Sequence, residues 1–112
     1  MAVYVTGEGV ITIDDKFEHD YEPIMENVKS ITTQPVKYII NTHHHTDHSG
    51  GNVKFAPTVE MISTANARPR ITFTDETSVF MGGKEVRAKY LGRTHTYGDA
   101  VPGKPAVWCV IP

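Results

Sequence analysis

The chain has 112 residues, a length that favours a single domain with a modest hydrophobic core. Its hydrophobic content of 39% and charged content of 21% are typical of a soluble globular protein. The formal net charge of −2 argues against a protein that binds nucleic acid by electrostatic attraction.

The N-terminal part predicts a hairpin followed by a helix. Two apolar runs, Ala2 to Thr6 and Val10 to Ile13, flank the turn Gly7-Glu8-Gly9. Residues Tyr21 to Ile31 then show helical spacing of apolar side chains, with a proline in the first turn. The apolar side chains of this helix are Ile24, Val28 and Ile31.

The rest of the chain predicts mostly strands. Val36 to Ile40 reads as a buried strand, and a short helix is expected after Gly51. Further strands are predicted at Thr58 to Ser63, Ile71 to Phe73, Thr77 to Met81 and Glu85 to Tyr90, with Gly82-Gly83 turning the last pair into a hairpin. Val101 to Ala106 is predicted to be a poor strand, because its two prolines cannot donate hydrogen bonds. This order predicts an α/β (α+β) fold with one sheet packed against a helix layer.

Four of the six histidines fall in one short window, His43-His44-His45-Thr46-Asp47-His48, directly after the strand Val36 to Ile40. Imidazole and carboxylate are the ligands that zinc, iron or manganese prefer in proteins. A solvated polar loop or an expression tag is the alternative, but a tag would lie at a terminus. The window therefore predicts a metal site.

The spacing within the window suggests how the ligands are shared. In an extended segment, residues two apart point the same way, so His43 and His45 can reach one ion together. Asp47 and His48 follow where the chain turns and can face a second ion. His44 alternates away from its neighbours and is expected to face the site entrance.

A third histidine is needed to complete the first ion's shell, and only two remain. His95 lies on a Gly-flanked loop after the strand Glu85 to Tyr90, where it can converge with the first window. His19 lies among acidic residues before the helix and is expected to be a solvated surface residue. His95 is therefore the predicted third ligand.

These residues resemble the metallo-β-lactamase superfamily of metallohydrolases. The resemblance rests on His43-x-His45-x-Asp47-His48 with Ser49-Gly50-Gly51-Asn52, and on Gly92-Arg93-Thr94-His95-Thr96-x-Gly98-Asp99. It runs from about Ala2 to about Val101. The family fold is an αββα sandwich of two similar halves, of which this chain would supply the N-terminal one, with residues 102–112 atypical for the family.

The resemblance implies a dinuclear, usually zinc, hydrolase. His43, His45 and His95 would hold one ion, and Asp47 and His48 would contribute to the other. Asp14 matches an early aspartate of the family that orients the site, although a simple turn residue is an equal alternative. In the expected mechanism a metal-bound hydroxide attacks a carbonyl-type carbon, and Asp47 orients that water and relays its proton.

The chain also departs from the family. It ends near where a bridging aspartate would be expected, and it has no histidine after His95. We therefore expect a shortened or disrupted gene product in which the second metal is weakly held, with Cys109 as a substitute ligand or simply a buried strand residue. Half a sandwich would expose an apolar sheet face, which predicts a homodimer or a larger homo-oligomer.

Other interpretations stay open at this stage. A non-catalytic metal-binding or self-assembling fragment is one, and a nuclease-like hydrolase is another, although no Lys/Arg-rich run supports the latter. The expected partner is a small-molecule substrate, which could be a lactam, lactone, thioester or phosphoester, and neither nucleic acid nor a membrane. The N-terminus lacks signal-peptide features, so the cytoplasm is the expected location, with secretion after removal of a leader as the alternative.

Overall fold

The computed structural model describes residues 1–64, 69–90, 101–104 and 107–108. Its first sheet, here called sheet A, has five strands in the order β1-β2-β3-β4-β5. β1 pairs with β2 as an antiparallel hairpin, and β2 through β5 run parallel to one another. The strands are β1 (Ala2–Val5), β2 (Val10–Ile13), β3 (Val36–Ile40), β4 (Glu60–Thr64) and β5 (Ile71–Phe73).

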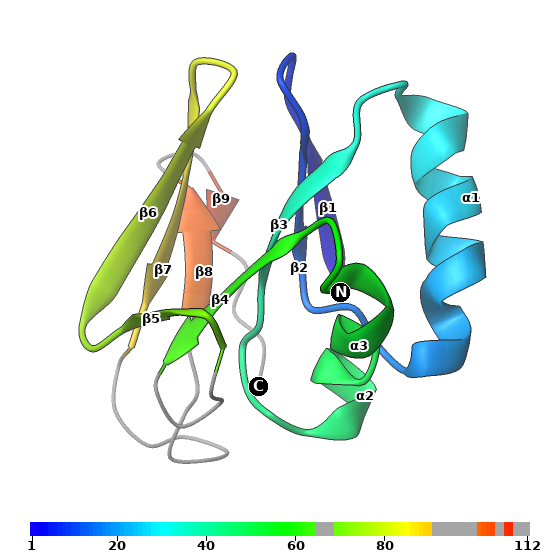
Figure 1. Ribbon diagram of the computed structural model, residues 1–112. Coiled ribbons are helices and arrows are strands. Elements are labelled where there is room, and N and C mark those ends of the chain that lie inside the picture. Colours follow the sequence, from blue (N-terminus) through cyan, green and yellow to red (C-terminus); the bar gives the residue numbers. More distant parts are fainter. Residues whose placement is uncertain (65–68, 91–100, 105–106, 109–112) are drawn as a thin grey trace.

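A second sheet, sheet B, is antiparallel and has the order β6-β7-β8-β9. Its strands are β6 (Glu76–Met81), β7 (Lys84–Lys89), β8 (Val101–Lys104) and β9 (Val107–Trp108). The two sheets pack face to face, and the helices lie on the other side of sheet A (Figure 1). The helices are η1 (Glu18–Asp20), α1 (Tyr21–Ile31), α2 (Thr46–Ser49) and α3 (Asn52–Phe55).

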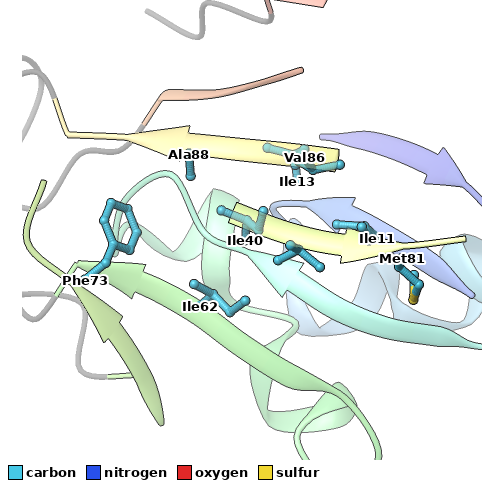
Figure 2. Close-up of a cluster of buried hydrophobic side chains, with 9 residues drawn as sticks. Ile11, Ile13, Ile40, Ile62, Phe73, Met81, Val86 and Ala88 are labelled. Atoms are coloured by element: carbon cyan, nitrogen blue, oxygen red, sulfur yellow. The ribbon is translucent and has the colours of Figure 1, made fainter. Parts of the chain in front are cut away.

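The centre of sheet A is buried on both faces, since every residue of β2 and four of the five residues of β4 are buried. On one face of sheet A, the side chains pack against α1 and α3 around Ile39 and Phe55. On the opposite face of sheet A, side chains such as Ile11 and Ile40 pack against sheet B around Val86 (Figure 2). The alternation in β6 and β7, where buried and more exposed positions follow one another, fits strands with only one face against the core.

Several predicted elements are confirmed with the same bounds. These are the strands Val10–Ile13, Val36–Ile40 and Ile71–Phe73, and the helix Tyr21–Ile31. Both predicted hairpins are also present. Among the described helices, none is long and apolar enough to cross a membrane.

The prediction of a single sheet is wrong. β6 and β7 belong to sheet B, not to sheet A, because the chain turns between Phe73 and Glu76 into a separate layer. Alternating apolar residues indicate which face of a strand is buried, but they do not say which sheet the strand joins. The fold class α/β (α+β) is confirmed.

The prediction of a poor strand at Val101 to Ala106 is wrong for its first part. Val101–Lys104 forms β8 and pairs with β7, with Pro102 opposite Ala88. On the other side, β9 pairs with Gly103 and Lys104, and none of the residues that the structure describes pairs with Pro102 there. Proline is compatible with a strand where its nitrogen is not needed as a donor to the neighbouring strand.

The exposed apolar face that motivated the dimer prediction is not present on the strands whose side chains are described. Sheet B covers the inner face of sheet A. On β6 and β7, the exposed or partly exposed positions are mostly polar, with Phe80 as the large apolar exception. Self-association therefore stays a prediction without this apolar face to support it.

Candidate metal centre

The residues of the histidine window lie where two parallel strands of sheet A end. β2 ends at Ile13 and is followed by Asp14, and the neighbouring β3 ends at Ile40. Because parallel strands end at the same edge, Asp14 meets the loop that follows β3. We call residues 41–51, which include α2, the 41–51 loop.

Three side chains in this loop can share an ion. Ligand atoms of His43, Asp47 and His48 all lie within 4.8 Å of one another. Asp47 and His48 belong to α2, which begins directly after His45. Two imidazoles and a carboxylate form a donor set that suits zinc or another divalent transition metal, so the residues fit the implied ion.

The exposed fraction of these three side chains increases from His43 through His48 to Asp47. His43 is 4% exposed, whereas the side chain of His48 is 22% exposed and that of Asp47 is 56% exposed. Asp47 Oδ2 lies 3.4 Å from His48 Nε2. The group therefore opens to solvent on the Asp47 side, where a small molecule could approach.

One buried carboxylate orients both imidazole rings. Asp14 Oδ2 lies 2.8 Å from His48 Nδ1 and 2.8 Å from Thr42 Oγ1, and Thr42 Oγ1 lies 2.9 Å from His43 Nδ1. If the Thr42 hydroxyl donates to Asp14, it accepts from His43 Nδ1–H, and His48 Nδ1–H donates directly to Asp14. In this arrangement both histidines present Nε2 for an ion. Carboxylates that do not contact the ion commonly fix the tautomer and orientation of histidine ligands in this way.

Asp14 is held firmly in this position. It is 1% exposed, and the backbone N–H of Thr42 donates to its Oδ1 over 2.7 Å. Its backbone N–H donates to the carbonyl of Ile40, and its φ of 61° is uncommon for a residue with a side chain. Such left-handed residues concentrate at functional sites, where the surrounding structure imposes them.

The next residue, Asp15, is fully buried and lies beneath the same loop. Its Oδ1 accepts the backbone N–H of Gly51 over 3.0 Å, while its Oδ2 has no hydrogen-bond partner among the described residues. Burial raises the pKa of Asp15 from 3.8 to about 7; the Gly51 N–H opposes this rise and the neighbouring Asp14 charge adds to it.

The other residues considered in the sequence analysis are placed as follows. His45 lies beside the group, with its ring centroid 5.0 Å from that of His43, and the exposed His44 ring lies 5.1 Å from His45. His19 is on the surface, stacked on Phe17. His95 and Cys109 fall outside the described residues, so their predicted roles as ligands stay predictions.

Sequence reasoning missed two residues of this arrangement, Thr42 and Asp15. Thr42 directly precedes the histidine window and links His43 to Asp14. For Asp15, a signal was available, since two consecutive acidic residues follow the mostly apolar run Val10 to Ile13. Because this strand is buried on both faces, we would not expect the side chains of both Asp14 and Asp15 to reach solvent at its end.

The chain is similar to known proteins both in sequence and in fold. The family described as the metallo-beta-lactamase superfamily matches residues 13–66, a range that begins at the last residue of β2 and contains β3 and the 41–51 loop. No match was found among curated proteins.

Solved structures match over nearly the whole chain. A metallo-beta-lactamase from Pontibacter korlensis has 26% identity and a TM-score of 0.83, covering 93% of this chain and 54% of its own. A subclass B3 metallo-beta-lactamase of Bradyrhizobium japonicum has 18% identity and a TM-score of 0.78, covering 89% and 48%. A flavo di-iron protein variant from Thermotoga maritima has 16% identity and a TM-score of 0.77, covering 95% and 31%.

This chain therefore spans about half the length of the metallo-beta-lactamase structures that it matches. The family match covers Asp14 and the complete 41–51 loop, and the structural matches extend the likeness to both sheets. On this evidence, residues 13–66 match the metallo-β-lactamase superfamily, and the chain shares the fold of the metallo-beta-lactamase structures.

Proposed function

We propose that this protein binds a divalent metal ion, with zinc as the first candidate, and acts as a metal-dependent hydrolase. The observation that carries the proposal is the convergence of His43, Asp47 and His48, whose ligand atoms lie within 4.8 Å of one another. The rings of both histidines are linked to one buried carboxylate, that of Asp14. His45 and His95 are proposed as further ligands on the family resemblance.

The roles of the chain's own residues follow from their positions. Asp14 would keep the His48 ring in the tautomer that presents Nε2, and Thr42 would do the same for His43. A bound divalent ion would supply Lewis-acid activation of a carbonyl-type substrate and a nucleophile at neutral pH. Asp47, exposed and next to His48 Nε2, would orient the attacking water and take up its proton.

The proposed substrate is a small molecule with a hydrolysable carbonyl, with a β-lactam as the first candidate because several matching structures are metallo-beta-lactamases. Nucleic acid is not proposed, because the chain carries a formal net charge of −2. Iron is the alternative ion, since one matching structure is a flavo di-iron protein.

A second candidate function is metal binding without turnover. The observation that favours it is that the chain spans 54% of the Pontibacter korlensis structure and 48% of that from Bradyrhizobium japonicum. The matched half could then hold an ion without forming a complete active site by itself. Metal content and turnover must therefore be measured separately.

The test compares single histidine variants of the purified protein. His43→Ala and His45→Ala should each lower the zinc content measured by elemental analysis, because each removes a proposed ligand. His19→Ala is the matched control, since this histidine is exposed on the surface and stacks on Phe17. Its zinc content should equal that of the parent protein.

Activity is then screened on the same samples with a β-lactam and a thioester. Hydrolysis that is lost in His43→Ala and retained in His19→Ala would support the hydrolase. Zinc in the parent protein without hydrolysis would favour metal binding alone. A parent protein that binds neither zinc nor iron at micromolar concentration would refute the proposed function.

A further inference from the structure

Asp15 makes two hydrogen bonds to the backbone of the 41–51 loop, at both ends of one short segment. Its backbone N–H donates to the carbonyl of His48 over 2.9 Å, and its Oδ1 accepts the N–H of Gly51 over 3.0 Å. The segment between these contacts is the end of α2. Asp15 therefore fixes the backbone on which the His48 ring is mounted.

Gly51 is packed against Asp15 so closely that no side chain fits between them. A Cβ added to Gly51 would lie 2.7 Å from the Asp15 carbonyl oxygen and 3.0 Å from Asp15 Cγ. Because the φ of Gly51 is −75°, the requirement for glycine here comes from this contact and not from the backbone conformation. The contact leaves the loop little freedom to shift relative to Asp15.

Asp15 also lies between two residues with left-handed backbone, Asp14 with φ 61° and Lys16 with φ 62°. Such a conformation is energetically unfavourable for a residue with a side chain and persists only where its surroundings impose it. Lys16 adds a third contact to the same segment, because its carbonyl accepts the N–H of Gly51. The strained tripeptide and the loop are thus bonded to each other at several points.

Asp14 contacts the ring of His48, and Asp15 contacts the backbone of the same residue. The Asp14 carboxylate contacts the Nδ1 of His48, and the Asp15 N–H contacts the carbonyl of the same residue. We propose that Asp15 is a positioning residue of the metal centre, which holds residues 48–51 so that the His48 ring stays seated on Asp14. This inference rests on the proposed metal-binding function and extends it to a residue that does not itself face the ion.

The competing interpretation is that Asp15 only stabilises the fold. A buried polar residue elsewhere separates the two. Thr6 is 4% exposed and its hydroxyl donates to the carbonyl of Gly9 in the hairpin between β1 and β2. Thr6→Ala therefore serves as a matched control that weakens the fold without touching the 41–51 loop.

The experiment titrates Co²⁺ into the metal-free protein and follows the visible absorption of the bound ion, together with thermal unfolding. Asp15→Ala should bind Co²⁺ about 10- to 100-fold more weakly than the parent, the usual effect of losing an outer-layer partner. Asp15→Asn should restore the affinity, since its amide oxygen can still accept from Gly51. Thr6→Ala should lower the unfolding temperature and leave the affinity unchanged.

A second variant covers the case in which Asp15→Ala does not fold. Gly51→Ala adds a methyl group on the opposite side of the same contact and should weaken Co²⁺ binding in the same direction. Parent-like Co²⁺ affinity in a folded Asp15→Ala or Gly51→Ala protein would overturn the inference. An Asp15→Asn protein as weak as Asp15→Ala would overturn it too, because the hydrogen bond would not be the cause.

A parent protein that binds no Co²⁺ would refute the proposed function, and the inference is then judged on the metal-free protein. The imidazole ¹⁵N resonances of His48 report its hydrogen bond to Asp14. They should shift in Asp15→Ala and stay parent-like in Asp15→Asn and Thr6→Ala. Unchanged His48 resonances in Asp15→Ala would show that Asp15 does not position this ring.

Discussion

Two polar clusters of this protein differ in what surrounds them. The first lies below the 41–51 loop and is built on Asp14, Asp15 and Thr42, which are 1%, 0% and 3% exposed. The second lies on the outer face of sheet B, where Glu85 accepts hydrogen bonds from Ser78 and Arg87. Both contain a carboxylate with more than one hydrogen-bond donor, but only the first is shielded from water.

This difference determines what each cluster can do. In the buried cluster, every donor that loses its acceptor stays unsatisfied, so the arrangement has one low-energy geometry. On sheet B, hydrogen bonding by Ser78 and by Arg87 lowers the pKa of Glu85, yet water can replace either partner. A buried network can therefore hold ligands in a fixed position, whereas a surface network mainly keeps a sheet face soluble.

The largest expected effect comes from removing the centre of the buried cluster. Asp14→Ala leaves Thr42 N–H and His48 Nδ1–H without their acceptor and places alanine at a φ of 61°. Unsatisfied buried donors cost roughly 1–3 kcal/mol each, so the free energy of unfolding should fall by about 3 kcal/mol or more. Urea unfolding of the metal-free protein measures this loss.

Asp14→Asn is the matched control for this variant. Asparagine tolerates the left-handed conformation and keeps an acceptor oxygen, so it should lose less than half as much stability. If the two variants were equally stable, the hydrogen bonds to Asp14 would not be what holds the cluster together.

The fold could be predicted from the sequence where one physical rule dominates. The helix Tyr21–Ile31 has the required apolar period, and β2 and β3 are mostly apolar runs, so their bounds were predicted correctly. The second sheet was not predicted, because its existence depends on how β6 leaves β5 and not on any local pattern. The strand β8 was missed because the pairing of Val101–Lys104 with β7 depends on the tertiary structure and not on a local pattern.

The candidate site was predictable in its ligand types but not in its supporting contacts. Histidines and an aspartate in one short window indicate a metal on chemical grounds alone. The links through Thr42 and the backbone contacts of Asp15 join residues 28 to 36 positions apart in sequence. Those contacts depend on the parallel register of β2 and β3, which brings the two strand ends together.

A smaller effect is expected from the pH dependence of stability. The pKa of Asp15 is 3.8 when unperturbed and about 7 in the folded protein, so the folded state keeps a proton that the unfolded chain releases. The stability of the parent protein should therefore fall as the pH rises from about 4 to about 7, and the contribution should level off above that. Asp15→Asn, which has no proton to release, should lack this component.

The measurement is the free energy of urea unfolding of both metal-free proteins across this pH range. Because every other titrating group is shared, the difference between the two proteins isolates Asp15. The variant should gain stability relative to the parent with rising pH. Parallel curves would mean that Asp15 ionises in the folded protein as it does in the unfolded chain.

The smallest effect is expected on sheet B and completes the comparison. Arg87→Ala removes two contacts to Glu85, at 3.1 and 3.3 Å, and a longer one of 3.8 Å to Glu76. The Ser78 hydroxyl still donates to Glu85 and water replaces the guanidinium, so unfolding at physiological salt should show no measurable change. Any loss seen at low salt should disappear as salt is added, because screening weakens exposed pairs. A salt-independent loss as large as that of Asp14→Ala would mean that the Glu85 cluster is shielded from water, and burial would then no longer distinguish the two clusters.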